Sequence, residues 1–271
     1  MTVVSAFLIP GSPLPLVNRE NPPWGLIGDG LEKAATSLRA SNPDTICVYS
    51  TQWIAVLDQL WLTKPLVSGI HVDENWHEYG ELSFEFTVDT ELAHKCAEST
   101  SAVSVKSKGV DYDHFPVDTG TIVASNFLNP KNESQMLVTS NNLYHDWEVT
   151  TNLGKTVARQ ARELNRKIAI IGVGGLSGRF FRESIDITAD KIATPEDDRW
   201  NQKILELMEI GDTEGLLADI PQYRQKAMVD MGFKHFAFVL GALGSFSSAK
   251  IHAYGPLYGT GAAVIEYSFP G

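Results

Sequence analysis

A glycine-rich turn after an apolar run is the part of this chain whose residue types and spacing come nearest to a site for chemistry. Residues 167–173 are rich in β-branched side chains, which predicts a buried strand, and the sequence GGLSG at 174–178 follows directly. Glycine lets the backbone approach a ligand closely, with Ser177 in the wall of a pocket. A histidine after Ser177 could transfer protons near neutral pH, but Gly178 has no side chain. The turn therefore predicts the frame of a catalytic site that lacks its functional group.

Two further predicted strand ends carry residues that could line the same pocket. The first strand ends in IPGSP at 9–13, whose prolines and glycine predict a rigid loop containing Gly11 and Ser12. The second ends near Gln52 and Trp53, and ligand sites in open α/β sheets form at such strand ends. A histidine in place of Gln52 could bind a metal, whereas a glutamine amide is a poor ligand for iron or zinc. Hydrogen bonding of Gln52 to the loop backbone is therefore the simpler interpretation.

Other patterns that resemble functional motifs do not carry a function on their own. The sequence DTG at 118–120 is found in aspartic proteases, but those enzymes need two matched carboxylates and the chain has no second copy. Nucleotide-binding, nucleophile-elbow and CxxC motifs do not occur. The seven histidines show no metal-binding spacing. The densest group of ligand types is typical of an exposed loop, and it consists of His71, His77, Asp73, Glu74 and Glu78.

The composition of the chain limits its partners. It has 271 residues, a formal net charge of −11 and two cysteines, Cys47 and Cys96. The acidic balance argues against nucleic-acid binding, which requires a basic face, and two cysteines cannot build a disulfide framework. The first ten residues have no basic segment before their apolar run and are too short to span a membrane. We therefore expect a cytoplasmic protein with no nucleic-acid or membrane partner.

Apolar runs alternate with helical patterns along the chain. Strands are predicted at 3–9, 45–50, 121–124, 135–139, 167–173, 250–254 and 262–269. Helices are predicted at 26–40, 90–99, 148–165, 195–210 and 233–243. Segments 57–90 and 100–120 lack periodicity, and we expect long loops there, near a pocket mouth or a partner surface. The alternation predicts an α/β fold: a single domain over residues 1–271, with a central mixed β-sheet flanked by helices.

Five short motifs, spread in order over nearly the whole chain, resemble those of the class III extradiol dioxygenases, the protocatechuate 4,5-dioxygenase-like family. They are IPGSP at 9–13, YSTQW at 49–53, DTG at 118–120, GGLSG at 174–178 and GALG at 241–244. The resemblance implies an enzyme fold that uses non-haem Fe(II) and O2 to cleave aromatic rings. In this family two histidines and one glutamate hold the iron, and further histidines in the pocket handle protons and dioxygen.

Carried over position by position, the resemblance implies that this chain lacks those groups. The positions of the family's histidines are occupied here by Gly11, Gln52, Thr119 and Gly178. Gly232 is the expected counterpart of the glutamate, with Asp230 as the alternative. We therefore expect no catalytic residue, metal ligand or cofactor in this chain. What remains is a degenerate pocket, for which the expected lining is Ser12, Trp53, Ser177 and Phe180.

The family includes enzymes built from two related subunits, of which only the β subunit carries iron, and the chain resembles the iron-free α subunit. The resemblance implies a structural, stabilising role beside a catalytic β subunit that holds Fe(II), in an α2β2 assembly. Two alternatives stay open. One is an enzyme with a recruited site, using His71, His77, His145 or His235. The other is a regulatory module that binds a small aromatic molecule among Trp24, Trp53, Phe180 and Phe181.

Overall fold

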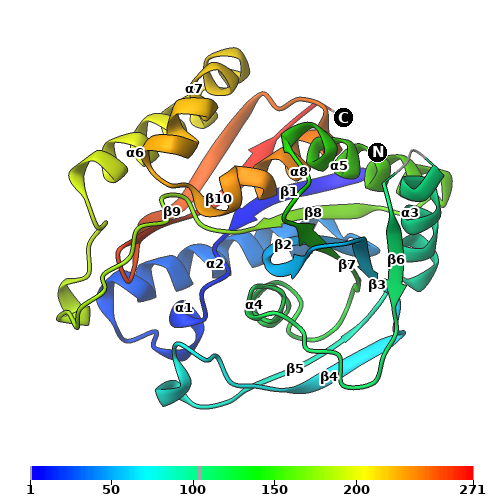
Figure 1. Ribbon diagram of the computed structural model, residues 1–271, viewed down its shortest axis with the longest axis horizontal. Coiled ribbons are helices and arrows are strands. Elements are labelled where there is room, and N and C mark those ends of the chain that lie inside the picture. Colours follow the sequence, from blue (N-terminus) through cyan, green and yellow to red (C-terminus); the bar gives the residue numbers. More distant parts are fainter. Residues whose placement is uncertain (1, 103–104, 271) are drawn as a thin grey trace.

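Eight strands form one mixed sheet in the computed structural model, which describes residues 2–102 and 105–270 (Figure 1). The order across the sheet is β6-β3-β7-β2-β8-β1-β10-β9. The strands are β1 (Val3–Ile9), β2 (Thr45–Ala55), β3 (Gln59–Leu62), β6 (Ser107–Val110), β7 (Gln135–Asn142), β8 (Ile168–Val173), β9 (Ser248–Leu257) and β10 (Thr260–Ser268). A separate two-stranded ribbon consists of β4 (Leu66–His71) and β5 (Leu82–Thr87).

The centre of the sheet is parallel and buried on both faces. β1 pairs with β8, β8 with β2, and β2 with β7, all in parallel, whereas β10 and β9 join in antiparallel order. Every residue of β8 is buried. Coverage of both faces explains why these strands read as continuous apolar runs rather than as an alternation of apolar and polar residues. The predicted α/β fold with a central mixed sheet flanked by helices is confirmed.

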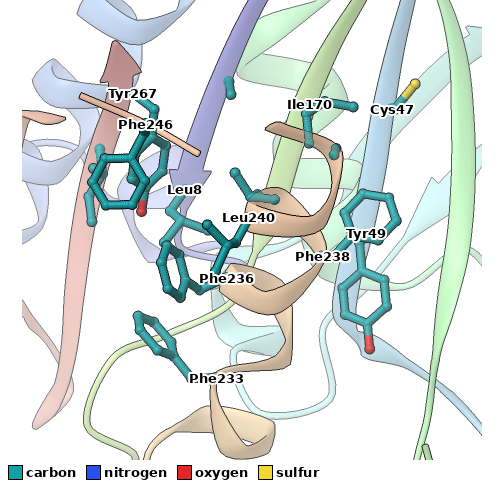
Figure 2. Close-up of a cluster of buried hydrophobic side chains, with 14 of the residues drawn as sticks. Leu8, Cys47, Tyr49, Ile170, Phe233, Phe236, Phe238, Leu240, Phe246 and Tyr267 are labelled. Carbon is teal, nitrogen blue, oxygen red and sulfur yellow. The ribbon is translucent and has the colours of Figure 1, made fainter. Parts of the chain in front are cut away.

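Helices pack on both sides of the sheet. On one side lie α1 (Leu14–Val17), α2 (Pro22–Ser41) and α4 (Thr119–Leu128). On the other lie α3 (Thr90–Ala102), α5 (Trp147–Glu163), α6 (Pro195–Glu209), α7 (Thr213–Lys226) and α8 (Lys234–Leu243). Figure 2 shows part of the second core, where Phe238 of α8 stacks on Tyr49 of β2 with ring centroids 5.0 Å apart. Aromatic burial of this kind fixes α8, and the loop before it, against the strand ends.

The predicted strand at 121–124 is wrong, because these residues lie inside α4. The Asp118 side chain caps that helix by accepting a hydrogen bond from the Thr121 amide (3.0 Å). α4 contacts β2 and β5, and almost all of its residues are buried. A short helix that is buried all round has no polar face, so its sequence cannot be distinguished from that of a buried strand by periodicity.

The long loops expected at 57–90 and 100–120 are also wrong in part. These segments contain β3, β4, β5 and β6, which are short, and most of β4 is exposed, so apolar periodicity is weak. The sequence pattern also misses α7, which has Pro221 inside it. The strand predicted at 3–9 is β1 with the same bounds, and the remaining predicted strands and helices are present with shifted ends. Among the described helices, none combines the length and apolar character that a membrane span requires.

Candidate functional site

The carboxyl ends of β1, β2 and β8 meet at one edge of the sheet. The IPGSP and GGLSG motifs follow β1 and β8 there, whereas Gln52 and Trp53, expected just past the second strand, lie inside β2, which continues to Ala55. Gly174, after β8, donates its amide hydrogen to the carbonyl of Ile9 at the end of β1 (2.9 Å). Two adjoining cavities open at this edge, as expected for a parallel sheet. The first has a volume of about 770 Å³ and the second about 850 Å³. Their walls share Gln52, Asn75, Asp230 and Met231.

Most of the residues predicted to form a pocket line one of these cavities. Those lining the first cavity are Gly11, Ser12, Gln52, Ser177, Gly178 and Phe180. Those lining the second are Gln52, Trp53 and Thr119. Gly232 lines neither cavity, whereas Asp230 lines both. The carboxylate that reaches the strand ends is therefore at position 230.

Gln52 fills the space that a side chain at position 11 would need. A Cβ on Gly11 would lie 2.9 Å from Nε2 of Gln52, and 3.1 Å from Cγ1 of Val173. The Gln52 side chain is exposed and its amide is the far end of a flexible chain, so this obstruction is able to move. The two positions expected for iron-binding histidines thus lie against each other and hold a glycine and an amide.

Backbone fills the corresponding space at Gly178. A Cβ on Gly178 would lie 2.4 Å from the carbonyl oxygen of Met228, well inside any normal contact. The Gly178 amide itself donates to the carbonyl of Ala227 (3.1 Å). A side chain at 178 would require the segment 227–228 to move. This position lacks the room for a histidine as well as the histidine itself.

Ser177 holds the turn in place through a buried polar network. Its hydroxyl accepts hydrogen bonds from Nδ2 of Asn201 (2.9 Å) and from the Gly261 amide (3.1 Å). The Ser177 amide donates to Oδ1 of Asn201 (3.2 Å), which also accepts from the hydroxyl of Tyr223 (2.8 Å). The sequence gives no sign of this role for Asn201, except that a polar residue falls on the buried face of α6. Buried polar groups are normally satisfied in this way.

Thr119 stands in a hydrogen-bonded chain in the wall of the second cavity. Its hydroxyl donates to Oδ2 of Asp73 (2.9 Å) and lies 2.8 Å from Nε2 of His71. Since the hydroxyl proton is directed to Asp73, Nε2 of His71 carries a hydrogen and donates to Thr119. Oδ1 of Asp73 accepts from the amides of Asn75 and Trp76. These groups tie the end of β4 to the start of α4 and leave Asp73 fully engaged.

Asp230 is presented to both cavities by a strained segment, 228–233. Three non-glycine residues of this segment have φ between 42 and 65°: Met228, Met231 and Phe233. Oδ2 of Asp230 accepts from the hydroxyl of Thr51 (2.7 Å) and the amide of Gly175 (2.9 Å). Burial raises the pKa of Asp230, and these two hydrogen bonds oppose that rise.

The histidines that could form a recruited site are dispersed. His235 is fully buried beneath the turn, neither ring nitrogen has a hydrogen-bond partner, and burial lowers its pKa to about 3. His71 lines the second cavity, whereas His77 lies in an exposed turn and His145 is half-buried beside Lys234. Within residues 2–102 and 105–270, no three or more His, Cys, Asp or Glu side chains are grouped so that they could hold a metal ion.

The donor set at the two cavities does not fit Fe(II). A facial triad needs two imidazoles and a carboxylate directed at one ion. Gly11 and Gln52, at the two positions where the resemblance implies histidine ligands, supply no imidazole to stand beside the carboxylate of Asp230. The residues at the expected ligand positions therefore do not form such a triad.

Comparison with known proteins places this arrangement in a family. The family model described as the catalytic LigB subunit of aromatic ring-opening dioxygenase matches residues 11–266. The chain is 47% identical over 270 residues to the 2-aminophenol 1,6-dioxygenase alpha subunit of Pseudomonas sp, which covers 99% of this chain and 100% of that one. It is 24% identical to the beta subunit from Pseudomonas sp, over 98% of this chain and 94% of that one.

A solved structure shares the fold. It is the crystal structure of the uncharacterized protein JW3007 from Escherichia coli K12, with a TM-score of 0.67 and 14% identity over 98% of this chain and 99% of that one. The resemblance drawn from the five motifs is confirmed by the family match and by the 47% identity over nearly the full length. The chain belongs to the LigB family of aromatic ring-opening dioxygenases.

Proposed function

We propose that this chain is the non-catalytic α subunit of a two-subunit dioxygenase that cleaves the ring of 2-aminophenol with O2, giving 2-aminomuconate 6-semialdehyde. A related β subunit binds Fe(II) and carries out the chemistry. The proposal draws support from the 47% identity to an alpha subunit of 2-aminophenol 1,6-dioxygenase and from the weaker, full-length similarity to a beta subunit. The complex holds two copies of each chain and works in the cytoplasm.

The observation that carries the proposal is the state of position 178. A missing histidine alone would describe an impaired enzyme. Here the Met228 carbonyl oxygen lies 2.4 Å from where a Cβ would stand, and Gly11 and Gln52 stand where two imidazoles would have to converge. A chain whose backbone excludes the acid–base group, and whose donor set does not fit iron, supports a structural role.

Iron analysis of the separated subunits tests the proposal. The chain is expressed alone and together with a β subunit, and both preparations are reconstituted anaerobically with Fe(II). We expect iron in the complex and in the isolated β subunit, O2 uptake with 2-aminophenol by the complex, and neither iron nor O2 uptake in the chain alone. Light scattering reports whether the complex is α2β2.

Stoichiometric iron in the isolated chain, or ring opening by that chain, would contradict the proposal. A chain that remains separate from the β subunit, while the β subunit alone shows full activity, would contradict the structural role. The reconstituted β subunit serves as the matched control, because its sequence is similar to this chain over nearly the full length and it passes through the same procedure.

A further inference from the structure

Most large apolar side chains of this chain are buried. Trp24, expected among the walls of a site for a small aromatic molecule, is fully buried and donates its indole hydrogen to Asp190 (2.8 Å). Five exposed apolar side chains depart from this pattern and lie together where β2 and β7 end. We name this surface the β2–β7 patch, and it consists of Ile54, Val56, Leu57, Leu143 and Tyr144. Exposed apolar side chains that gather on one surface mark a contact with another molecule.

Backbone pairing brings the two parts of the β2–β7 patch side by side. In the parallel ladder of β2 and β7, Ile54 is opposite Asn141, and the Leu143 amide donates to the carbonyl of Ala55 (2.9 Å). Burial alternates at this end of β2, where Ala55 is buried between the exposed Ile54 and Val56. A strand with one face in water normally presents polar residues on that face. Here the exposed face is apolar, so it has the character of a surface that another molecule covers.

The loop that follows β7 is held rigidly. The Asn142 side chain donates to the carbonyl of Asp58 (3.2 Å) and accepts from the Tyr144 amide (3.0 Å). From beneath, Nζ of the buried Lys234 donates to the carbonyls of Asn142 (2.8 Å) and Leu143 (3.3 Å). Tyr144 is nonetheless 79% exposed. An aromatic side chain presented by a rigid loop loses little conformational freedom on binding, as do the residues at the centre of strong protein interfaces.

One end of the β2–β7 patch is basic. The exposed Lys106 and Lys108 lie there, beside Leu57, because the Lys106 carbonyl accepts from the amide of Gln59 (2.7 Å). Lys108 pairs with the carboxylate of Asp58 (3.2 Å). Among the described residues, Lys106 forms no ion pair. One positive charge therefore remains unpaired at this end.

The other end of the patch is acidic. Asp146, the N-cap of α5, and Glu148, in the first turn of that helix, follow two and four residues after Tyr144, and both are exposed. Arg224 lies nearby, over the ring of Trp147 (5.9 Å to its centroid), and offsets one of these two charges. The β2–β7 patch thus has an apolar centre with opposite net charges at its two ends.

We propose that a second copy of this chain binds at the β2–β7 patch, in a two-fold contact that places Lys106 of each copy beside Glu148 of the other. A two-fold axis through the patch joins the apolar centre to itself and the basic end to the acidic end, so the charge pattern is self-complementary. An apolar centre with charges at the rim is typical of contacts between identical chains. This goes beyond the subunit role proposed above, because it assigns a contact between two copies of this chain and needs no β subunit.

Sedimentation velocity and light scattering of the full chain, expressed alone, test the inference. We expect a particle of twice the 29.8 kDa of the chain, which dissociates on dilution. Tyr144→Ala and Leu57→Asp are each expected to weaken this association by about tenfold or more, because they remove or disrupt the apolar centre. Tyr112→Ala is the matched control, since Tyr112 is 70% exposed but follows the opposite end of β6, and we expect no change.

A charge exchange tests the two-fold arrangement itself. Lys106→Glu and Glu148→Lys are each expected to weaken the association by about fivefold or more, because each places like charges together at two symmetric positions. The double variant restores opposite charges across the contact, and we expect its dissociation constant to return to within about threefold of the wild type. Melting temperatures of the variants show that both changes leave the fold intact. A partner of different sequence would not produce this rescue.

A chain that stays monomeric at every concentration would overturn the inference, and so would a dimer that survives Tyr144→Ala and Leu57→Asp. A double charge variant that associates as weakly as the single variants would also overturn it. If the chain alone is monomeric and Tyr144→Ala instead prevents association with the β subunit, the patch binds that subunit, and the subunit role stands. Iron binding or ring opening by the chain alone contradicts only the subunit role, so the two proposals fail on different measurements.

Discussion

Positions 11 and 178 of the first cavity both carry glycine, yet the space beside each is taken in a different way. At Gly11 the obstruction is the amide end of Gln52, which can swing aside. At Gly178 it is the carbonyl of Met228, which moves only with its loop, and that loop is held by the hydrogen bonds of Asp230. A side chain at position 11 could thus be accommodated by movement of Gln52, whereas one at position 178 could not be accommodated without movement of the backbone. The atoms beside a glycine, rather than the glycine itself, decide whether a functional side chain could be placed there.

The largest expected effect comes from Gly178, beside the Met228 carbonyl. Gly178→Ala places a Cβ 2.4 Å from the Met228 carbonyl, and we expect it to lower the free energy of unfolding by about 3 kcal/mol, as overpacking does. Urea denaturation measures the change. Gly175→Ala, in the same turn, is the matched control, because the nearest atom to its Cβ is the Gly261 carbonyl oxygen at an ordinary 3.5 Å. Equal losses in the two variants would show that the carbonyl is not the cause.

A second effect concerns the buried ring of His235, whose Nδ1 lies 2.6 Å from where a Cβ on Gly174 would stand. The pKa of His235 is about 3 in the folded chain, against an ordinary value of 6.5 in the unfolded chain. Between pH 6.5 and 3 the imidazole of His235 is therefore protonated in the unfolded chain and neutral in the folded chain. The free energy of unfolding falls as pH drops through this window. We expect a loss of about 2 kcal/mol on going from pH 7 to pH 5.

His235→Leu isolates this contribution. Because neither ring nitrogen has a partner, an apolar replacement strands no donor or acceptor, and stability at pH 7 is expected to change little. Denaturation curves at pH 7 and pH 5 for both proteins give the difference in pH dependence, in which the titration of Asp230 cancels. Identical pH dependence in the two proteins would mean that the pKa of His235 does not change on folding.

A third effect concerns the second cavity, where Thr119 occupies a position at which the resemblance implies a histidine. Thr119→Val keeps the shape but removes the hydroxyl that links His71 to Asp73. We expect a loss of about 1 kcal/mol in the free energy of unfolding, while Thr119→Ser retains the hydroxyl and stays closer to the wild type. Chemical denaturation of the three proteins measures the order, and a serine variant as unstable as the valine variant would remove the hydroxyl from the explanation.

The smallest effect concerns Gly11, where the obstructing side chain is able to move. Gly11→Ala is expected to cost less than about 1 kcal/mol, because the Gln52 amide can move away from the new Cβ. In a double-mutant cycle, Gln52→Ala should remove most of that cost, which shows as non-additivity. An additive pair would place the obstruction in Val173 instead, whose Cγ1 lies 3.1 Å from the same Cβ.

The sequence predicts the strands better than it predicts the cavity walls. β1 lies where its β-branched run predicts, and the GGLSG turn does reach the first cavity, because strand ends and glycine turns are local patterns. α4, at 119–128, could not be predicted in this way, because burial on all sides removes the alternation of apolar and polar residues that marks a helix. The contact of Gly178 with Met228 could not be predicted either, because it joins segments far apart in the chain.

Position 230 shows the same limit within the site. A motif carried over by spacing favours Gly232, but the left-handed residues of segment 228–233 turn Asp230, two residues earlier, to the cavities. Local sequence contains no signal for the positive φ angles at positions 228, 231, 232 and 233. The hydrogen bonds that hold Asp230 come from Thr51 and Gly175, which only the sheet brings together.

The carbonyl of Met228 also constrains the evolutionary paths open to the chain. A mutation that placed histidine at position 178 would first produce a clash, so the protein would lose stability before it gained any function. Such a change would need the loop 228–233 to be rebuilt in the same step. Any evolutionary route to a side chain at position 178 therefore requires several coupled substitutions rather than one.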